Sequence, residues 1–217
     1  MAESSLPPNP TPAQQLEQER ARWNHHLLDA TWRSTRFNPE PNALLKKAVQ
    51  AVPPGAALDV NMGEGRNALY LAGLGWKVTG IDLADQALAF AQQRAGQLRV
   101  ALTTVVGDAN TYDWGNSCWD LILLCYADES AHLAQVQAAL RPGGLLVLEN
   151  FHADVNQTWQ TPPTHRVGFA TNELPDLYCT ADFQIVRYEE PVAVADFTRE
   201  THRLVRLVAR KTTKRAQ

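Results

Sequence analysis

The chain has 217 residues, of which 45% are hydrophobic and 20% are charged. These values are ordinary for globular proteins and exclude a wholly disordered chain, a collagen and a coiled coil. A length near 200 residues predicts one domain around one core. The 20 Lys and Arg residues against 23 Asp and Glu residues give a formal net charge of −3. A weakly acidic chain without a basic stripe is not expected to bind nucleic acid.

Cysteine use and the N-terminal residues bear on the compartment of the protein. Cys118, Cys125 and Cys179 form no C-x-x-C pair, so neither a disulfide framework nor a thiolate zinc site is expected. The first residues lack the basic and apolar regions of a signal peptide, and the longest apolar runs are too short to cross a bilayer. We therefore expect a cytoplasmic protein without membrane contact, and the sequence leaves a monomer or a homodimer open.

The N-terminal quarter differs in pattern from the rest of the chain. Residues 1–13 contain four prolines and are predicted to form a mobile arm. Helix formers occupy residues 14–26, and residues 41–52 place their apolar side chains on one helix face. Residues 14–53 are therefore expected to form a helical lid segment, with Trp32 and Arg33 as part of it.

From residue 54 to residue 217 the pattern predicts one globular unit. Short apolar strands are expected at 56–60, 77–83, 100–107, 120–126 and 145–151, alternating with helices at 64–73, 86–98 and 130–140. A short helix over 172–178 precedes strands at 184–188 and 202–210. Alternating strands and helices predict a doubly wound, mostly parallel sheet of the Rossmann-like α/β class. The last two strands lack a crossover helix, so the expected seven-stranded sheet ends in an antiparallel hairpin.

The densest chemical pattern spans residues 57–83. Asp59 lies at the end of a predicted strand, a tight loop follows over residues 61–65, and the next helix begins there. The free N–H groups at such a helix start face whatever binds in the loop. Asp82 ends the next strand, 17 residues after Gly65. An acid at this place in the fold is positioned to accept hydrogen bonds from two ribose hydroxyls.

One shared pattern and three further features bear on which cofactor the loop binds. Residues 63–68 match G-x-G-x-x-A, a pattern found in both nicotinamide enzymes and methyltransferases. Asp59 would repel a pyrophosphate but suits a ligand that carries an ammonium and a sulfonium. Asp108 follows the third strand, well placed for an adenine amino group. The chain also has no Tyr-x-x-x-Lys pair, which a short-chain dehydrogenase needs, so a nicotinamide cofactor is disfavoured.

Several motifs together resemble the class I S-adenosylmethionine-dependent methyltransferases. They are D-x-x-x-G-E-G-R-N-A-L-Y-L-A at 59–72, G-W-x-V-x-G-x-D at 75–82, Gly-Asp at 107–108, Trp-Asp at 119–120, R-P-G-G at 141–144 and L-V-A-R-K at 207–211. Within the class the chain is similar to the small bacterial group that includes the tellurite-resistance methyltransferases. The resemblance covers roughly residues 32–211. It implies S-adenosylmethionine as cofactor and methyl transfer to a small-molecule nucleophile by in-line displacement.

The resemblance also implies a set of cofactor-binding residues. Gly63 and Gly65 would admit the methionine part, Asp82 would hold the ribose, Leu83 and Asp108 with its neighbour would contact the adenine, and the carbonyl near Cys125 would meet the ammonium. The full expected set is Asp59, Gly63, Glu64, Gly65, Asn67, Asp82, Leu83, Asp108, Ala109 and Cys125.

One departure from the family concerns the loop itself. The family usually has Gly-Cys-Gly where this chain has Asn61, Met62 and Gly63. Asn is the residue other than glycine that best tolerates positive φ, so we expect the loop to keep its turn. The Asn61 side chain would then add a hydrogen bond or narrow the pocket.

The acceptor is expected over the loops after the fourth and fifth strands. Candidate catalytic residues there are His152, Asp128 and Tyr126, of which the first two are candidate bases. Asp128, Glu149 and Asn150 would also suit magnesium. The rest of the chain does not resemble a metal-dependent family, so no metal is predicted.

Two alternatives from other classes stay open. One is a protein that binds S-adenosylmethionine or its product without transferase activity, suggested by Asn61 and by the lack of an evident catalytic dyad. The other is a nicotinamide-dependent oxidoreductase, which Asp59 disfavours.

Overall fold

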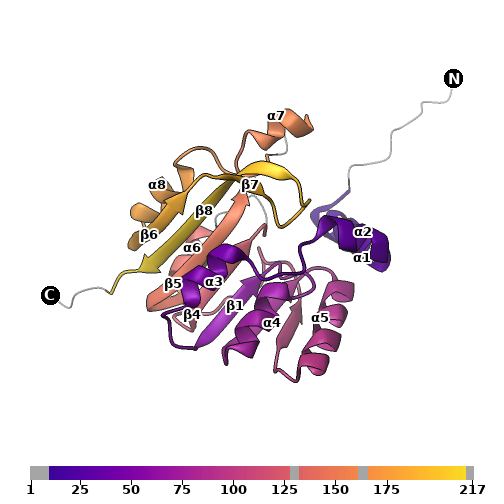
Figure 1. The fold of residues 1–217 in the computed structure, drawn as a ribbon, viewed down its shortest axis with the longest axis horizontal. Helices are drawn as coiled ribbons and strands as arrows, with labels where there is room; N and C mark the ends of the chain where they lie inside the picture. Colours follow the sequence, from indigo (N-terminus) through magenta and orange to yellow (C-terminus); the bar gives the residue numbers. More distant parts are fainter. Residues whose placement is uncertain (1–9, 128–131, 161–165, 214–217) are drawn as a thin grey trace.

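The central strands of the fold consist of nearly continuous runs of apolar residues. The computed structural model describes residues 10–127, 132–160 and 166–213 (Figure 1). Its described strands are β1 (Ala56–Val60), β2 (Lys77–Asp82), β3 (Thr103–Val106), β4 (Trp119–Cys125), β5 (Leu140–Phe151), β6 (Phe183–Glu189), β7 (Val192–Val194) and β8 (Thr201–Lys211). Its described helices are α1 (Pro12–Leu28), α2 (Ala30–Arg36), α3 (Ala43–Val49), α4 (Arg66–Gly73), α5 (Asp85–Leu98), α6 (Leu133–Ala139), α7 (Val155–Trp159) and α8 (Glu173–Cys179).

The strands form one sheet in the order β3-β2-β1-β4-β5-β8-β6, with β7 paired to β8. The first five strands along this path run parallel to one another, and β8 runs antiparallel to β5, β6 and β7. The order reverses between β1 and β4, because β2 lies on one side of β1 and β4 on the other. Open α/β sheets bind ligands at the carboxyl ends of the strands beside such a reversal.

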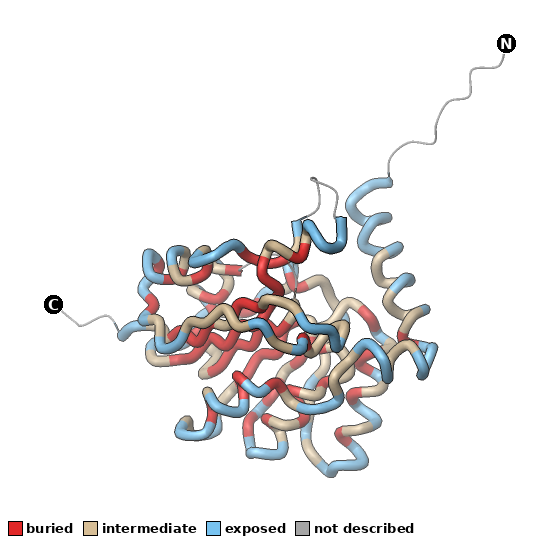
Figure 2. The backbone as a smooth tube through the Cα atoms, turned by 45° about the horizontal axis from the view of Figure 1, so that its top comes forward, coloured by how far each residue is buried: buried red, intermediate tan, exposed pale blue. Residues whose placement is uncertain are grey.

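Each face of the sheet has its own apolar core, as strands covered on both faces require. Helices α3, α4 and α5 cover one face through side chains such as Leu45 and Leu71, which are fully buried. Helices α6 and α8 cover the other face, where Tyr178 is fully buried. The buried strands lie between these two helix layers (Figures 1 and 2). The carboxyl ends of β1, β2 and β4 are thereby held in fixed relation.

Helices α1 and α2 lie apart from the layers that cover the sheet (Figure 1). Leu27 of α1 is buried against Ala84 and Ala87 at the start of α5. Asp85 accepts hydrogen bonds from two α1 side chains, Arg20 at 3.1 Å and Asn24 at 2.6 Å. These contacts hold α1 next to the loop that follows β2.

The expected Rossmann-like fold with antiparallel strands at its C-terminal end is confirmed, and three short elements add to it. The strand β7 joins the seven expected strands, and α2 and α7 are helices that the pattern does not predict. No residue of α2 and only Val155 of α7 is buried, so neither helix has an apolar face that would give a periodic pattern, and β7 has three residues. Within the expected N-terminal arm, residues 1–9 lie outside the described residues. Residues 12 and 13 already belong to α1, because Thr11 caps it with a capping box.

Candidate functional site

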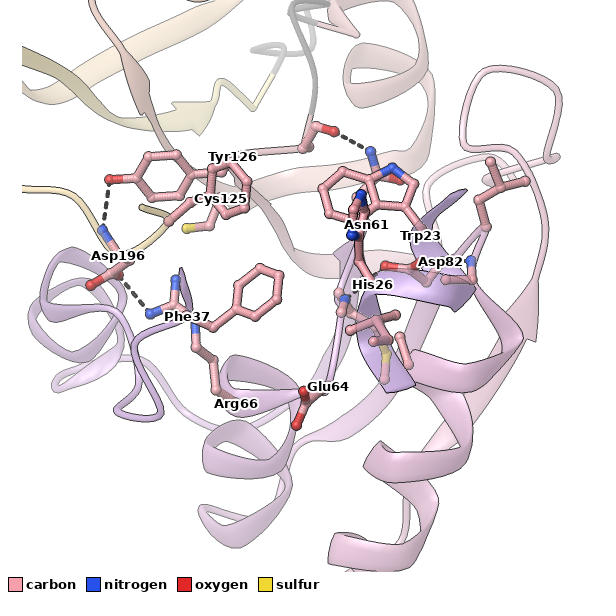
Figure 3. Close-up of a pocket in the computed structure, with 18 of the residues that line it drawn as sticks. Trp23, His26, Phe37, Asn61, Glu64, Arg66, Asp82, Cys125, Tyr126 and Asp196 are labelled. Atoms are coloured by element: carbon pink, nitrogen blue, oxygen red, sulfur yellow. Dashed lines mark hydrogen bonds and ion pairs between the residues drawn. The ribbon is translucent and has the colours of Figure 1, made fainter. Parts of the chain in front are cut away.

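A cavity of about 1310 Å³ opens at the carboxyl ends of β1, β2 and β4. Its floor is the loop between β1 and α4 together with the ends of β2 and β4, and its cover comes from α1, α2 and the segment that joins β7 to β8 (Figure 3). Nine of the ten predicted cofactor residues are brought together in or beside this cavity. The nine that line it are Asp59, Gly63, Glu64, Asn67, Asp82, Leu83, Asp108, Ala109 and Cys125.

The loop between β1 and α4 is built from left-handed backbone positions. Asn61 has φ 52°, Gly63 has φ 57° and Gly65 has φ 76°. A side chain added at Gly63 would meet no atom within 4 Å, so glycine there is required by its backbone and leaves space open. Gly65 is the N-cap of α4, and its own N–H donates to the carbonyl of Met62 at 3.0 Å. Gly65 therefore shapes the turn and, unlike the other predicted residues, is not among those that line the cavity.

Asn61 keeps the turn as expected, and its side chain has a definite partner. The Nδ2 group donates to the carbonyl of Ala127, which follows β4. This hydrogen bond ties the cofactor loop to the end of the neighbouring strand. The replacement of the family's glycine thus adds a link across the cavity floor.

Asp82 is held by the backbone around it. Its Oδ2 accepts from the N–H of Gly63 and its Oδ1 from the N–H of Ala84, each at 2.8 Å. Burial raises the pKa of this carboxyl above its ordinary value, and the hydrogen bonds from these two N–H groups and that of Leu83 oppose the rise. The carboxylate is therefore fixed in direction before any ligand binds.

Asp59 is a buried acid with an unsatisfied oxygen. The residue is 2% exposed, and its Oδ2 has no hydrogen-bond partner. Burial raises its pKa to about 7, against the opposing effect of the Arg66 guanidinium and the N–H of Ala68. An unpaired buried carboxyl is costly unless a cation or donor satisfies it. A ligand with an ammonium group in this cavity would supply that partner.

Asp108 and Ala109 lie on the rim beyond β3. Asp108 Oδ1 accepts from the N–H of Asn110 at 2.9 Å and from its side chain at 3.0 Å. The carbonyl of Ala109 accepts from the indole of Trp114 at 2.9 Å. The turn that presents this edge of the cavity is therefore ordered by its own hydrogen bonds.

The end of β4 leads into a buried polar network. Burial raises the pKa of the Cys125 thiol well above its ordinary value, so this thiol stays protonated. Tyr126, at φ 56°, donates its hydroxyl to Glu149 at 3.0 Å and accepts from the N–H of Asp196 at 3.2 Å. Burial, and then the Glu149 charge, raises the pKa of Tyr126. Both sides of this hydroxyl are thus engaged.

Glu149 does not have the surroundings of a metal ligand. The side chain is 1% exposed, accepts from Asn42 at 2.8 Å and forms an ion pair with Arg206. Among the described residues, no group of three His, Cys, Asp or Glu side chains is arranged to hold a metal ion. Asp128, the other carboxylate considered for a metal and a candidate base, lies outside the described residues.

His152, the other candidate base, is not among the residues that line the cavity. It is 7% exposed, its Nε2 lies 3.1 Å from the Thr171 hydroxyl, and its Nδ1 accepts from the N–H of Asp154. The residue directly follows the buried end of β5, and its backbone forms a β-bridge with Phe169. Tyr126, another of the three predicted catalytic residues, does line the cavity.

Three polar pairs join the lid segment to the cofactor loop. Arg33 of α2 lies 3.4 Å from Glu64, and Asn67 accepts from the N–H of Asn42 at 2.8 Å. Arg66 pairs with Asp196 at 2.7 Å and donates to the carbonyl of Glu40 at 3.0 Å. Each pair connects a residue of the loop to a segment distant in the sequence.

Sequence reasoning missed Asn42, Asp196 and Phe197. Asn42 caps α3 by accepting from the N–H groups of Leu44 and Leu45, and an Asn directly before an apolar helical run is a signal that could have found it. Asp196 and Phe197 lie in a short connection between strands without periodicity. Their place in the cavity follows from tertiary packing alone.

Comparisons with known proteins agree with this geometry. Residues 57–144 match the family described as "Methyltransferase domain". The chain is 28% identical over 151 residues to the "Probable S-adenosyl-L-methionine-dependent methyltransferase TehB" of Haemophilus influenzae, covering 66% of this chain and 51% of that protein. Residues 57–144 therefore form a methyltransferase domain.

Two other known proteins match a larger share of this chain. "Hemagglutinin 1" of Eikenella corrodens is 27% identical over 172 residues, covering 76% of this chain and 56% of that protein. The solved Burkholderia thailandensis 1,6-didemethyltoxoflavin-N1-methyltransferase, with its substrate and S-adenosylhomocysteine bound, has a TM-score of 0.65 at 22% identity, covering 96% of this chain and 94% of that one. The chain spans about half the length of the curated relatives it matches.

Both of the methyltransferases named above are linked to S-adenosylmethionine, because TehB is described as dependent on it and the Burkholderia enzyme was solved with S-adenosylhomocysteine bound. The cavity fits that group on two observations of its own, namely the unsatisfied Asp59 oxygen and the open space at Gly63. Across the described residues, no helix combines the length and the apolarity needed to cross a membrane.

Proposed function

We propose that this protein transfers a methyl group from S-adenosylmethionine to a small-molecule nucleophile. The observation that carries the proposal is that two carboxyl groups with different surroundings line the same end of the cavity. Asp59 has an oxygen without a partner, and Asp82 is fixed by two backbone N–H groups. An unpaired carboxyl suits an ammonium, and a fixed carboxylate suits a pair of ribose hydroxyls.

The remaining predicted residues complete the cofactor site in this proposal. The carbonyl of Cys125 is assigned to the methionine ammonium together with Asp59, and Leu83 to the adenine face. Asp108 and the backbone of Ala109 are assigned to the adenine edge. Glu64 and Asn67 line the same cavity and also hold the lid, through Arg33 and Asn42 respectively.

When bound, the cofactor supplies a sulfonium methyl group that is open to in-line displacement. The electrophile is already activated, so the protein contributes mainly alignment and exclusion of water. The lid helices α1 and α2 cover the cavity for this purpose. Tyr126 is proposed as a positioning residue, because its hydroxyl is held between Glu149 and the backbone of Asp196.

The proton of the acceptor needs a base only if the nucleophile is protonated at working pH. Asp128 stays a candidate for that role. His152 is not carried into the proposal, because its ring is engaged by Thr171 and by the backbone of Asp154 away from the cavity.

Turnover with a panel of acceptors tests this proposal. The protein is incubated with S-adenosylmethionine and a set of thiols, phenols, amines, selenite and tellurite, and the release of S-adenosylhomocysteine is measured. At least one acceptor should raise that release above the rate without acceptor, and Asp59→Ala should abolish the increase. Tight binding of S-adenosylhomocysteine without release from any acceptor would favour the alternative, a binding protein of this fold without transferase activity.

A further inference from the structure

Besides Tyr126, six Trp and Phe side chains line the cavity, and they come from five separate segments. We refer to them as the aromatic band, and they are Trp23, Trp32, Phe37, Phe151, Trp159 and Phe197. Trp23 belongs to α1 and Trp32 to α2, whereas Phe151 ends β5 and Trp159 ends α7. The cofactor roles proposed above use none of these six rings.

Phe197 contacts three other rings of the aromatic band. Its ring centroid lies 6.2 Å from that of Trp23, 5.5 Å from that of Phe37 and 6.5 Å from that of Phe151. Phe151 in turn lies 5.0 Å from Trp159. These are the separations of tilted and edge-to-face aromatic pairs. The band is therefore continuous from the lid helices to the end of the sheet.

The cavity has room for a second molecule beside the cofactor. Sites for drug-sized molecules have volumes of about 300–1,000 Å³, and this cavity has about 1310 Å³. The cofactor roles occupy the strand ends and the glycine loop. The space beside the aromatic band is then available to the methyl acceptor.

Charged side chains at the band are largely paired with one another. Glu64 pairs with Arg33 and Asp196 with Arg66. Glu19 of α1 pairs with Arg22 and also accepts from the indole of Trp23 at 2.8 Å. Three carboxylates and three guanidiniums at the described cavity wall thus neutralise one another. Arg199 also lines the cavity, and its guanidinium donates to the carbonyl of Ser34 at 3.1 Å. An ammonium or a small oxyanion placed there would have to displace one of these pairs.

We propose that the acceptor is an uncharged aromatic or heteroaromatic molecule that carries a hydroxyl or ring-nitrogen nucleophile and packs against Phe197. The inference rests on the proposed function. For a phenolic acceptor, the oxygen lone pair forms the bond to the methyl carbon, and the carbon–sulfur bond breaks with its electron pair left on sulfur. The phenolic proton passes to solvent water.

Equilibrium dialysis of three probes tests the acceptor class. The full chain, with and without saturating S-adenosylhomocysteine, is dialysed against 2-naphthol, n-hexylamine and sodium selenite. The chain should retain 2-naphthol at least about tenfold more strongly than either of the other two. Phe197→Ala should weaken 2-naphthol retention at least about tenfold and change S-adenosylhomocysteine binding less than about twofold. Leu28→Ala is the matched control, because Leu28 is an exposed lid residue that does not line the cavity, and it should change neither.

A second variant distinguishes a lost contact with 2-naphthol from a failure of the Phe197→Ala protein to fold. Phe197→Leu keeps an apolar side chain and should still weaken 2-naphthol retention several-fold. The inference is overturned if hexylamine or selenite is preferred, or if both Phe197 variants retain 2-naphthol as the unchanged chain does. If 2-naphthol depends on Phe197 but S-adenosylhomocysteine does not bind, the aromatic site stands and the proposed function fails. If neither molecule binds, both are overturned.

Discussion

At the scale of single residues, two acids with different surroundings define the proposed cofactor site. Asp82 is satisfied by N–H groups from the loop it faces, whereas Asp59 is left with an unpaired oxygen. Their places before and after the glycine loop were predictable, because each ends a short apolar strand. The unpaired state of Asp59 was not predictable, because it depends on how completely α4 and the neighbouring strands exclude water.

Removal of the Asp82 carboxylate should weaken cofactor binding. Asp82→Ala loses its hydrogen bonds to the ligand and is expected to reduce affinity for S-adenosylhomocysteine by about 1.5–3 kcal/mol, measured by calorimetry. Asp113→Ala is a suitable control, because Asp113 also accepts from a backbone N–H, that of Gly115 at 2.8 Å, and does not line the cavity. An affinity unchanged by Asp82→Ala would refute the ribose role.

Asp59 should make cofactor binding depend on pH. Its pKa of about 7 in the free protein means that the carboxyl is largely protonated below that value and must lose its proton to pair with an ammonium. Affinity for S-adenosylhomocysteine should therefore rise with pH and level off above about pH 7, by about tenfold between pH 6 and pH 8.

The matched variant for this pH dependence is Asp59→Asn, which cannot ionise. Its affinity should be lower than that of the unchanged chain at pH 8 and nearly flat between pH 6 and pH 8. Calorimetric titrations at both pH values give the comparison. Equal slopes in the two proteins would show that another group sets the pH dependence.

At the scale of elements, the polar residue before α3 holds several segments together. Asn42 caps α3 through Oδ1, while its Nδ2 donates to Glu149 of β5 and to Asp196 beyond β7, each at 2.8 Å. Its backbone N–H donates to Asn67 of α4. One residue thus joins the end of the lid segment to the sheet and to the first turn of α4.

Loss of these bonds should destabilise the fold. Asn42→Ala removes a helix cap and the two hydrogen bonds that Nδ2 donates to Glu149 and Asp196, and the free energy of unfolding should fall by about 2–3 kcal/mol in urea titrations. Asn42→Asp keeps the cap but places a third carboxylate beside Glu149 and Asp196, so it should be at least as destabilising. An Asn42→Asp variant as stable as the unchanged chain would contradict the donor role of Nδ2.

The longer elements were predictable within a few residues, and the shorter ones were not. Alternation of apolar strands with amphipathic helices predicted β1, β2, β4, α4 and α5 closely, because each has a regular period or a marked boundary. The split between α1 and α2 follows from Asp29, which accepts from the N–H groups of Thr31 and Trp32. The sequence pattern predicts a helix only over residues 14–26, so α2 beyond this cap was not expected from it.

At the scale of the whole molecule, the site depends on segments far apart in the chain. The strand ends and the glycine loop supply the acids, and the lid and the connection from β7 to β8 supply the aromatic cover (Figure 3). The first group has a sequence motif and was predicted. The second group has no sequence motif, because Phe197 contacts Trp23 and Phe151 through the packing of segments that are far apart in the sequence.

The central claim is that this cavity takes S-adenosylmethionine and not a nicotinamide cofactor. Calorimetry of the full chain with S-adenosylhomocysteine and, in parallel, with NADH tests it most directly. We predict saturable binding of one S-adenosylhomocysteine per chain and no heat of binding with NADH, because the unpaired Asp59 favours an ammonium and repels a pyrophosphate. Tight binding of NADH without binding of S-adenosylhomocysteine would contradict the account.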